Sequence, residues 1–86
     1  MDREKLKEVA GHYFKDQMGM EPDMFEFTCE NDEQWEYNLR VTAGYRKFDI
    51  RMLPMANRIC LTEIKHEGTF TDATQLAGYD CCFRKL

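Results

Sequence analysis

The chain has 86 residues, of which 33% are charged, and its formal net charge is −4 at pH 7. This length allows one modest hydrophobic core, so residues 1–86 are expected to form a single domain. The apolar fraction of 43% is too high for a disordered chain. No apolar run approaches the roughly 20 residues of a membrane-spanning helix, and no signal peptide follows Met1, so we expect a cytoplasmic protein.

The first element predicted is an amphipathic helix from Asp2 to about Met18. Asp2 is a suitable N-cap, whereas Gly19 and Pro22 are residues at which a helix ends. Apolar side chains recur at steps of three and four residues and form one stripe, made of Leu6, Val9, Ala10, Tyr13, Phe14 and Met18.

Four strands are expected to follow the helix, because side chains alternate between apolar and polar in this part of the chain. Pro54 is expected to end the third strand, since proline cannot donate a backbone hydrogen bond. In the fourth strand Ile64 falls on the face opposite Leu61. Either both faces are partly covered or a bulge near Thr62 shifts the register. The predicted ranges are Met24–Glu30, Trp35–Val41, Tyr45–Leu53 and Arg58–Lys65.

The last segment, residues 69–86, has two interpretations. Thr71 or Asp72 can cap a short helix over Asp72–Ala77, followed by an extended tail. Residues Tyr79–Phe83 can instead form a last strand at a sheet edge. We favour the first, and predict an α+β fold in which the N-terminal helix packs on a four-stranded antiparallel meander, with a short C-terminal helix or extended tail.

Catalytic and metal-binding signatures are missing from the sequence. The chain has no serine, no phosphate-binding loop and no dinucleotide-binding glycine motif. Its cysteines lack the Cys-x-x-Cys spacing, so we expect free thiols, no cofactor and no metal, and a protein that is not an enzyme. Two alternatives remain open, a Cys60–His66 nucleophile pair and a metal site assembled by the fold from Cys29, Cys60, His66 and either Cys81 or Cys82.

Charge is unevenly distributed along the chain. Residues 1–38 contain eleven acids and four bases, a balance of −7, whereas residues 39–86 have a balance of +3. The acidic segment 21–36 includes Trp35, and an aromatic side chain ringed by charge is typical of protein interfaces. We therefore predict that the chain binds another protein that has a basic surface. The predicted contact residues are Glu26, Glu30, Asp32, Glu33, Trp35 and Glu36.

Two further interpretations of the sheet are open. Its outer face can form a basic stripe with an aromatic side chain for stacking, which is the pattern of a nucleic-acid-binding module. The residues of that face are Arg40, Tyr45, Lys47, Arg51, Arg58 and Lys65. The overall acidity weighs against this alternative, because affinity depends on the number of phosphates neutralised. Exposed sheet edges also allow a symmetric homodimer.

In size, acidity and lack of catalytic signatures the chain resembles, in a general way, the small acidic proteins that bacteria and their phages use as inhibitors or adaptors. The resemblance is one of type, and no residue role is carried over from it. It implies a non-enzymatic inhibitor or adaptor that occludes a basic surface of its partner.

Overall fold

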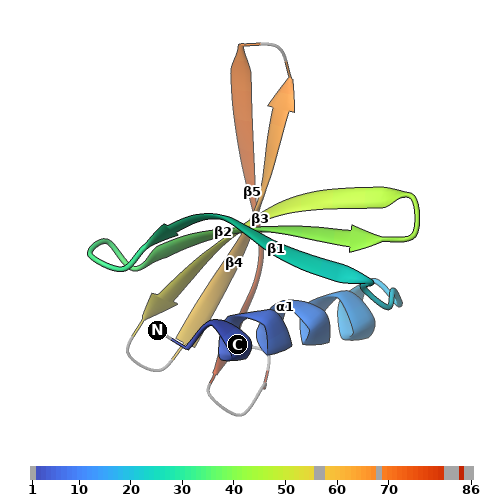
Figure 1. Ribbon diagram of the computed structural model, residues 1–86, viewed down its shortest axis with the longest axis horizontal. Coiled ribbons are helices and arrows are strands. Elements are labelled where there is room, and N and C mark those ends of the chain that lie inside the picture. The colour runs from blue at the N-terminus through green and yellow to red at the C-terminus, as the bar shows by residue number, and fades with distance from the viewer. Residues whose placement is uncertain (1, 56–57, 68, 81–83, 85–86) are drawn as a thin grey trace.

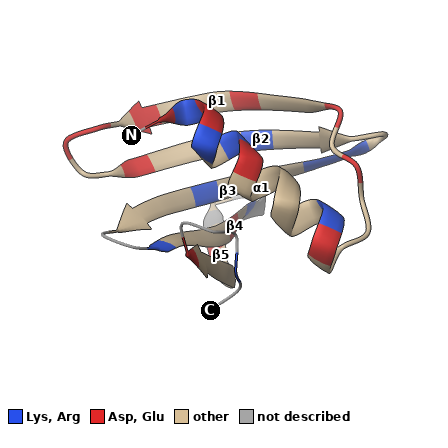
Figure 2. Ribbon diagram, turned by 90° about the horizontal axis from the view of Figure 1, so that it is seen from below, with Lys and Arg blue, Asp and Glu red and all other residues tan. Residues whose placement is uncertain are grey.

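The computed structural model describes residues 2–55, 58–67, 69–80 and 84, and in these residues it shows one helix and one five-stranded sheet (Figure 1). The sheet is an antiparallel meander with the order β1-β2-β3-β4-β5. The helix lies across one face of this sheet (Figure 2). The elements are α1 Arg3–Gln17, β1 Met24–Asn31, β2 Glu36–Ala43, β3 Arg46–Met55, β4 Arg58–Glu67 and β5 Phe70–Asp80.

The helix begins where the sequence predicts. The side chain of Asp2 accepts a hydrogen bond from the backbone N–H of Glu4 at 3.0 Å, which satisfies one of the free donors of the first turn. At the other end the N–H groups of Met18 and Met20 both donate to the carbonyl oxygen of Phe14. The α+β class and the amphipathic N-terminal helix are therefore confirmed.

The core lies between α1 and the sheet face that it covers. The apolar stripe of the helix meets the inward side chains of the strands, and Phe14 and Phe48 approach to 4.9 Å between ring centroids. Each large apolar side chain buried here contributes about 1.5–3 kcal/mol. The fully enclosed side chains are Leu6, Val9, Phe14, Tyr37, Leu39, Val41, Ile50, Met52, Leu61 and Tyr79.

The sequence analysis predicts that Pro54 ends the third strand, and this prediction is wrong. Strand β3 continues to Met55, and Pro54 is buried and paired with Ile59 of β4. The reason is that β2 pairs with β3 only as far as Met52. Beyond that point one side of β3 is a free edge, where the missing N–H of a proline leaves no hydrogen bond of the sheet unmade.

The predicted C-terminal helix over Asp72–Ala77 is wrong, because residues 70–80 form the fifth strand, β5. The register of β4 and β5 shifts between Leu61 and Thr62, but the extra residue of this bulge lies in β5, and β4 keeps a regular register with β3. Ile64 therefore stays on the face opposite Leu61, and its low exposure of 7% shows that both faces of β4 are partly covered. Leu61 is opposite Ala77 and Thr62 is opposite Gln75, which leaves Leu76 as the extra residue.

This bulge explains the misleading pattern. The extra residue lets Leu76 pack against the core next to Ala77. Two consecutive apolar residues break the alternation of a strand and resemble the spacing of a helix. The tail expected after residue 80 lies outside the described residues except for Arg84, whose Nε is 2.7 Å from Asp80 Oδ2.

Tyr79 of β5 has a buried hydroxyl group that lacks a hydrogen-bond partner among the described residues. Its side chain is fully enclosed, its ring meets the His12 imidazole edge-on at 5.4 Å, and burial raises the pKa of the phenol. An unpaired buried hydroxyl is unfavourable. We expect Tyr79→Phe to raise the free energy of unfolding by about 1 kcal/mol, measured by urea denaturation. The fully exposed Tyr45→Phe is the control. A loss of stability in Tyr79→Phe would contradict this expectation.

Candidate functional site

The turn between β1 and β2 combines an exposed tryptophan with an unusual backbone. Asn31 and Glu36 pair at its base, and Asn31 Oδ1 accepts a hydrogen bond of 3.1 Å from the N–H of Gln34. Trp35 has φ of 52° and is the only described residue other than glycine in the left-handed region. Its side chain is 53% exposed, so Trp35 does not share the buried face of Tyr37, although both residues belong to the strand predicted over Trp35–Val41.

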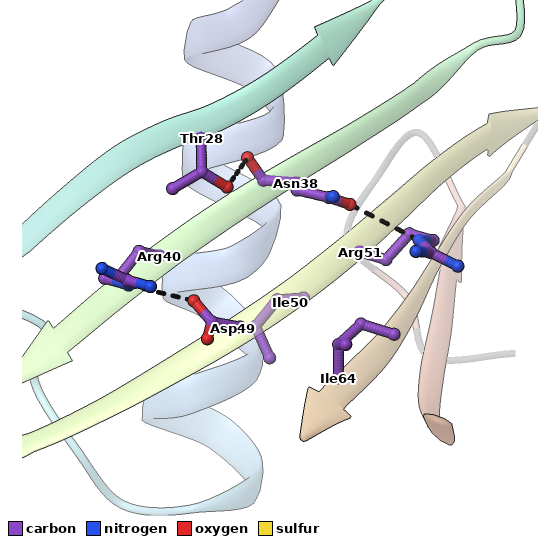
Figure 3. Close-up of a pocket in the computed structure, with 7 residues that line it drawn as sticks. All are labelled: Thr28, Asn38, Arg40, Asp49, Ile50, Arg51 and Ile64. Atoms are coloured by element: carbon purple, nitrogen blue, oxygen red, sulfur yellow. Dashed lines mark hydrogen bonds and ion pairs between the residues drawn. The ribbon is translucent and has the colours of Figure 1, made fainter. Parts of the chain in front are cut away.

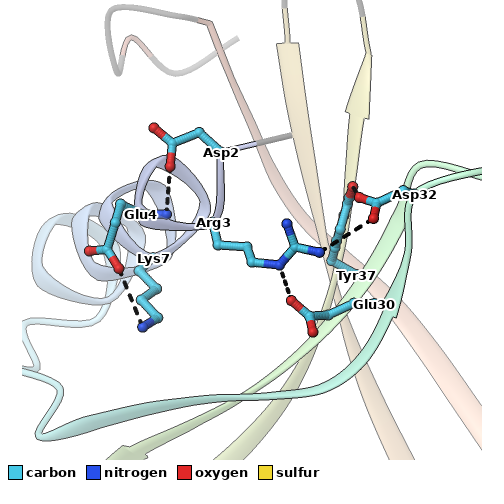
Figure 4. Close-up of polar contacts among 7 residues, drawn as sticks. All are labelled: Asp2, Arg3, Glu4, Lys7, Glu30, Asp32 and Tyr37. Atoms are coloured by element: carbon cyan, nitrogen blue, oxygen red, sulfur yellow. Dashed lines mark hydrogen bonds and ion pairs between the residues drawn. The ribbon is translucent and has the colours of Figure 1, made fainter.

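Asp32 of this turn and Glu30 near the end of β1 are held by the first turn of α1 (Figure 4). The guanidinium group of Arg3 forms ion pairs with Glu30 and, at 3.4 Å, with Asp32. The hydroxyl group of Tyr37 donates a hydrogen bond to Asp32, and Arg3 lies 5.8 Å from the centre of the Tyr37 ring. These contacts fix the turn against the helix, so two of the predicted contact acids have an intramolecular role.

The polar contacts at the turn change the pKa of Asp32. The hydrogen bond from Tyr37 and the charge of Arg3 favour its carboxylate form and lower its pKa from the ordinary 3.8. The same contact raises the pKa of Tyr37. A carboxyl group whose pKa is lowered by folding stabilises the folded state above its unfolded pKa and loses that contribution as the pH falls.

This linkage gives a testable pH dependence. We expect the free energy of unfolding of the native chain to decrease as the pH falls below about 4. The decrease should be smaller in Asp32→Asn, because the asparagine side chain does not titrate. The measurement is the urea midpoint from pH 6 to pH 2. Asp72→Asn, at an exposed position of β5, is the matched control and should follow the native chain. Parallel pH profiles for the native chain and Asp32→Asn would refute the role assigned to Asp32.

The other predicted contact acids lie apart from one another. Glu33 is exposed in the turn, next to Trp35. Glu36 and Glu26 belong to the open face of the sheet, defined as the face that points away from α1. There Glu36 pairs with Arg51 at 2.8 Å, and Glu26 is opposite Arg40 in the register. The structure therefore groups Glu30, Asp32, Glu33 and Trp35 at the turn, with Glu36 at its base, and leaves Glu26 on the strand.

The basic residues of the nucleic-acid alternative only partly share a face. Strand alternation puts Arg40, Lys47, Arg51 and Arg58 on the open face and Lys65 on the opposite side. Tyr45 lies in the β2–β3 turn and is fully exposed. Two of these cations are already neutralised across strands, Arg40 by Asp49 at 3.0 Å and Arg51 by Glu36. The open face is therefore a mixture of both charges.

A small hollow of about 160 Å³ lies in this open face (Figure 3). Thr28 Oγ1 donates to the carbonyl oxygen of Asn38, and Arg51 Nε donates to Asn38 Oδ1 at 3.4 Å. Ile64 forms part of the wall and is only 7% exposed, although it lies outside the core cluster. The polar groups of the hollow bind one another, and its volume is below the roughly 300–1,000 Å³ of a small-molecule site.

The structure also bears on the cysteine alternatives. Strand β4 is continuous from Arg58 to Glu67, so the backbones of Cys60 and His66 are about 20 Å apart along it, too far for a nucleophile pair. Cys29 is exposed and Cys60 is half-buried, and both are free thiols. Cys81 and Cys82 lie outside the described residues. Within the part of the chain that is described, three or more potential metal ligands do not come together.

A cleft at the opposite end of the sheet was not predicted from the sequence. It has a volume of about 630 Å³ and lies where β3 and β4 separate. Its lining residues are Met18, Arg46, Lys47, Phe48, Asp49, Glu63, Ile64 and Lys65. The one feature of this region that the sequence showed was Ile64, an apolar residue on the face of the fourth strand opposite Leu61.

Fold and sites together define a small acidic α+β domain, with one helix on an antiparallel meander and an exposed tryptophan turn. Comparison with protein-family models, with curated proteins and with solved structures gives no significant match to the chain. Among the described residues, the helix is too short and too polar to cross a membrane. Function therefore has to be argued from the geometry of these surfaces.

Proposed function

We propose that this chain is a non-enzymatic protein-binding domain whose partner contacts the β1–β2 turn, with Trp35 at the centre of the contact. The observation that carries the proposal is the pairing of an exposed indole with a left-handed backbone at Trp35. Tryptophan is the residue type most enriched at the energetic centres of protein interfaces. Its rigid ring also loses little conformational entropy on binding.

The backbone at Trp35 is unfavourable for the chain alone. A bulky residue with positive φ costs on the order of 1–3 kcal/mol, and glycine or asparagine fits such a position better. The neighbouring contacts hold the turn in place, through Asn31 at its base and through Arg3 from the helix. Such strain is commonly found at binding sites, where the surrounding structure imposes it.

The charges around Trp35 determine the kind of partner. Glu33 is exposed in the turn and has no ion-pair partner among the described residues, whereas Asp32 is already paired with Arg3. The segment from Glu21 to Glu36 contains no base. Complementary charge accelerates association and excludes partners of the same sign. We therefore assign the turn to a basic protein surface, which the domain would cover as an inhibitor or an adaptor.

The ion pairs of the open face weigh against the nucleic-acid alternative. A phosphate backbone competes with Asp49 for Arg40 and with Glu36 for Arg51. Affinity for nucleic acid depends on the number of phosphates that free cations neutralise. The open face therefore offers few free cations to a phosphate backbone.

Site-specific photo-crosslinking tests the proposal in the cells from which the gene comes. The photoreactive residue p-benzoylphenylalanine replaces Trp35 in one variant and Tyr45 in the other. Tyr45 is the matched control, because it is a fully exposed aromatic residue in a turn at the opposite end of β2. We expect one protein adduct at position 35 that persists after nuclease treatment. Adducts with the same protein at both positions, or adducts lost with nuclease, would refute the assignment of the turn.

A further inference from the structure

We propose that the cleft between β3 and β4 binds an acidic, extended segment of a partner protein, which adds to the free edge of β3 as an extra strand. The cleft and the Trp35 turn lie at opposite ends of β2, about 26 Å apart for the eight residues of that strand. The proposal is independent of the function assigned to the turn.

The backbone in the cleft is that of a divided sheet. Strand β3 pairs with β2 from Arg46 onward, but it pairs with β4 only from Asp49 onward. Residues 46–48 of β3 are thus paired on one side only in the described strand register. The facing residues of β4, 65–67, pair only with β5. Figure 1 shows the cause, since the β4–β5 hairpin leaves the sheet in a different direction from the β2–β3 hairpin.

Free strand edges accept extended peptides. Unpaired backbone N–H and C=O groups bind a peptide strand with the same hydrogen bonds that hold a sheet together. Alternate side chains of such a peptide point to the two sides of the cleft, where the apolar groups are Met18 and Phe48 on the side of α1 and Ile64 on the side of the open face. The width left by the divergence of the two hairpins gives the peptide a place beside β3.

The charge of the cleft selects acidic residues in that peptide. Its two acids already have partners, because Asp49 pairs with Arg40 and Glu63 lies 3.9 Å from Lys65. Arg46 and Lys47 form no ion pair with any described residue, although the guanidinium group of Arg46 lies 5.0 Å from the centre of the Phe48 ring. Among the described side chains, Arg46 and Lys47 therefore leave a positive rim, to which Asp and Glu side chains of a bound strand are complementary.

Selection from a random peptide library tests this inference. Displayed peptides of about ten residues, the upper length of ordinary strands, are selected on the native chain and on the double variant Arg46→Glu, Lys47→Glu. Arg58→Glu is the control, because it reverses the charge of one basic side chain at an exposed position at the other end of the sheet. We expect peptides with Asp or Glu alternating with apolar residues, and poor in proline. The strongest peptide should lose at least about tenfold in affinity on the double variant and be unaffected by Arg58→Glu.

Amide resonances then locate the bound peptide. We expect shifts and slowed hydrogen exchange at residues 46–48 and 65–67, and unchanged peptide affinity in Trp35→Asn, which separates this result from the fate of the turn proposal. Selection without acidic enrichment, or shifts at the Trp35 turn, would overturn the inference. Equal affinity for the same peptide with proline at alternate positions would exclude strand addition. Displacement of the peptide by inorganic phosphate alone would indicate an anion site and would refute the proposal. Slowed hydrogen exchange that increases with protein concentration in the absence of peptide would indicate a second copy of the chain and would also refute it.

Discussion

Phe14→Ala is expected to lower the free energy of unfolding by about 3–5 kcal/mol, the range for removing a large aromatic side chain from a packed core. Phe14 is fully buried and contacts Phe48 at 4.9 Å between ring centroids. It lies near the end of α1, where its carbonyl oxygen accepts the two hydrogen bonds that close the helix. A cavity at this position weakens the apolar contact between the helix and the sheet.

The measurement for Phe14→Ala is urea denaturation followed by circular dichroism and by Trp35 fluorescence. Phe27→Ala is the matched control, because Phe27 is only partly buried against the same core and should cost less. The expected loss of about 3–5 kcal/mol in Phe14→Ala is a large fraction of the roughly 5–15 kcal/mol that stabilises a small domain. Phe14→Ala should therefore be partly unfolded at 37 °C. Equal effects for the two variants would contradict the position assigned to the helix.

Trp35→Asn is expected to reduce affinity for the protein partner about 30-fold or more, which corresponds to a loss of at least about 2 kcal/mol. The same substitution should not lower the free energy of unfolding, because asparagine tolerates the left-handed backbone that costs tryptophan on the order of 1–3 kcal/mol. The combination of lost binding and retained stability distinguishes a contact residue from a core residue. The partner identified by crosslinking at position 35 is the ligand for this titration.

The control for Trp35→Asn is Tyr45→Asn, which makes a comparable change in an exposed turn at the other end of the sheet. Its affinity for the partner should equal that of the native chain. Unchanged affinity in Trp35→Asn would remove the indole from the interface. A loss of several kcal/mol in stability would instead show that Trp35 supports the fold.

The Trp35 turn and the cleft between β3 and β4 are proposed to bind different partners, and the crosslinking and peptide experiments test the two sites separately. The acidic turn suits a basic surface, and the cleft with its positive rim suits an acidic peptide. Because they lie at opposite ends of β2, two partners can bind without overlap. Binding of both partners at once would favour an adaptor, whereas occupation of the turn alone is what an inhibitor requires.

Much of the fold could be predicted from local patterns in the sequence. The apolar stripe from Leu6 to Phe14 and the Asp2 cap determine α1 because helix periodicity and capping involve residues close in the chain. The alternation of Tyr37, Leu39 and Val41 determines which face of β2 is buried, because successive side chains of a strand point to opposite sides. The acidic character of the 21–36 segment and the presence of Trp35 in it were likewise plain in the sequence.

Other features were decided only by the tertiary structure, because they depend on residues distant in the chain. Pro54 is accepted in β3 because β2 has already ended beside it, and the extra residue Leu76 makes a strand resemble a helix. Trp35 is exposed because the turn, rather than strand alternation, sets its backbone. Arg3 forms ion pairs with Glu30 and Asp32, so these acids are not free to bind a partner. The cleft beside Lys47 forms because the β2–β3 and β4–β5 hairpins diverge. No local pattern contains these contacts, since each forms only when separate elements come together.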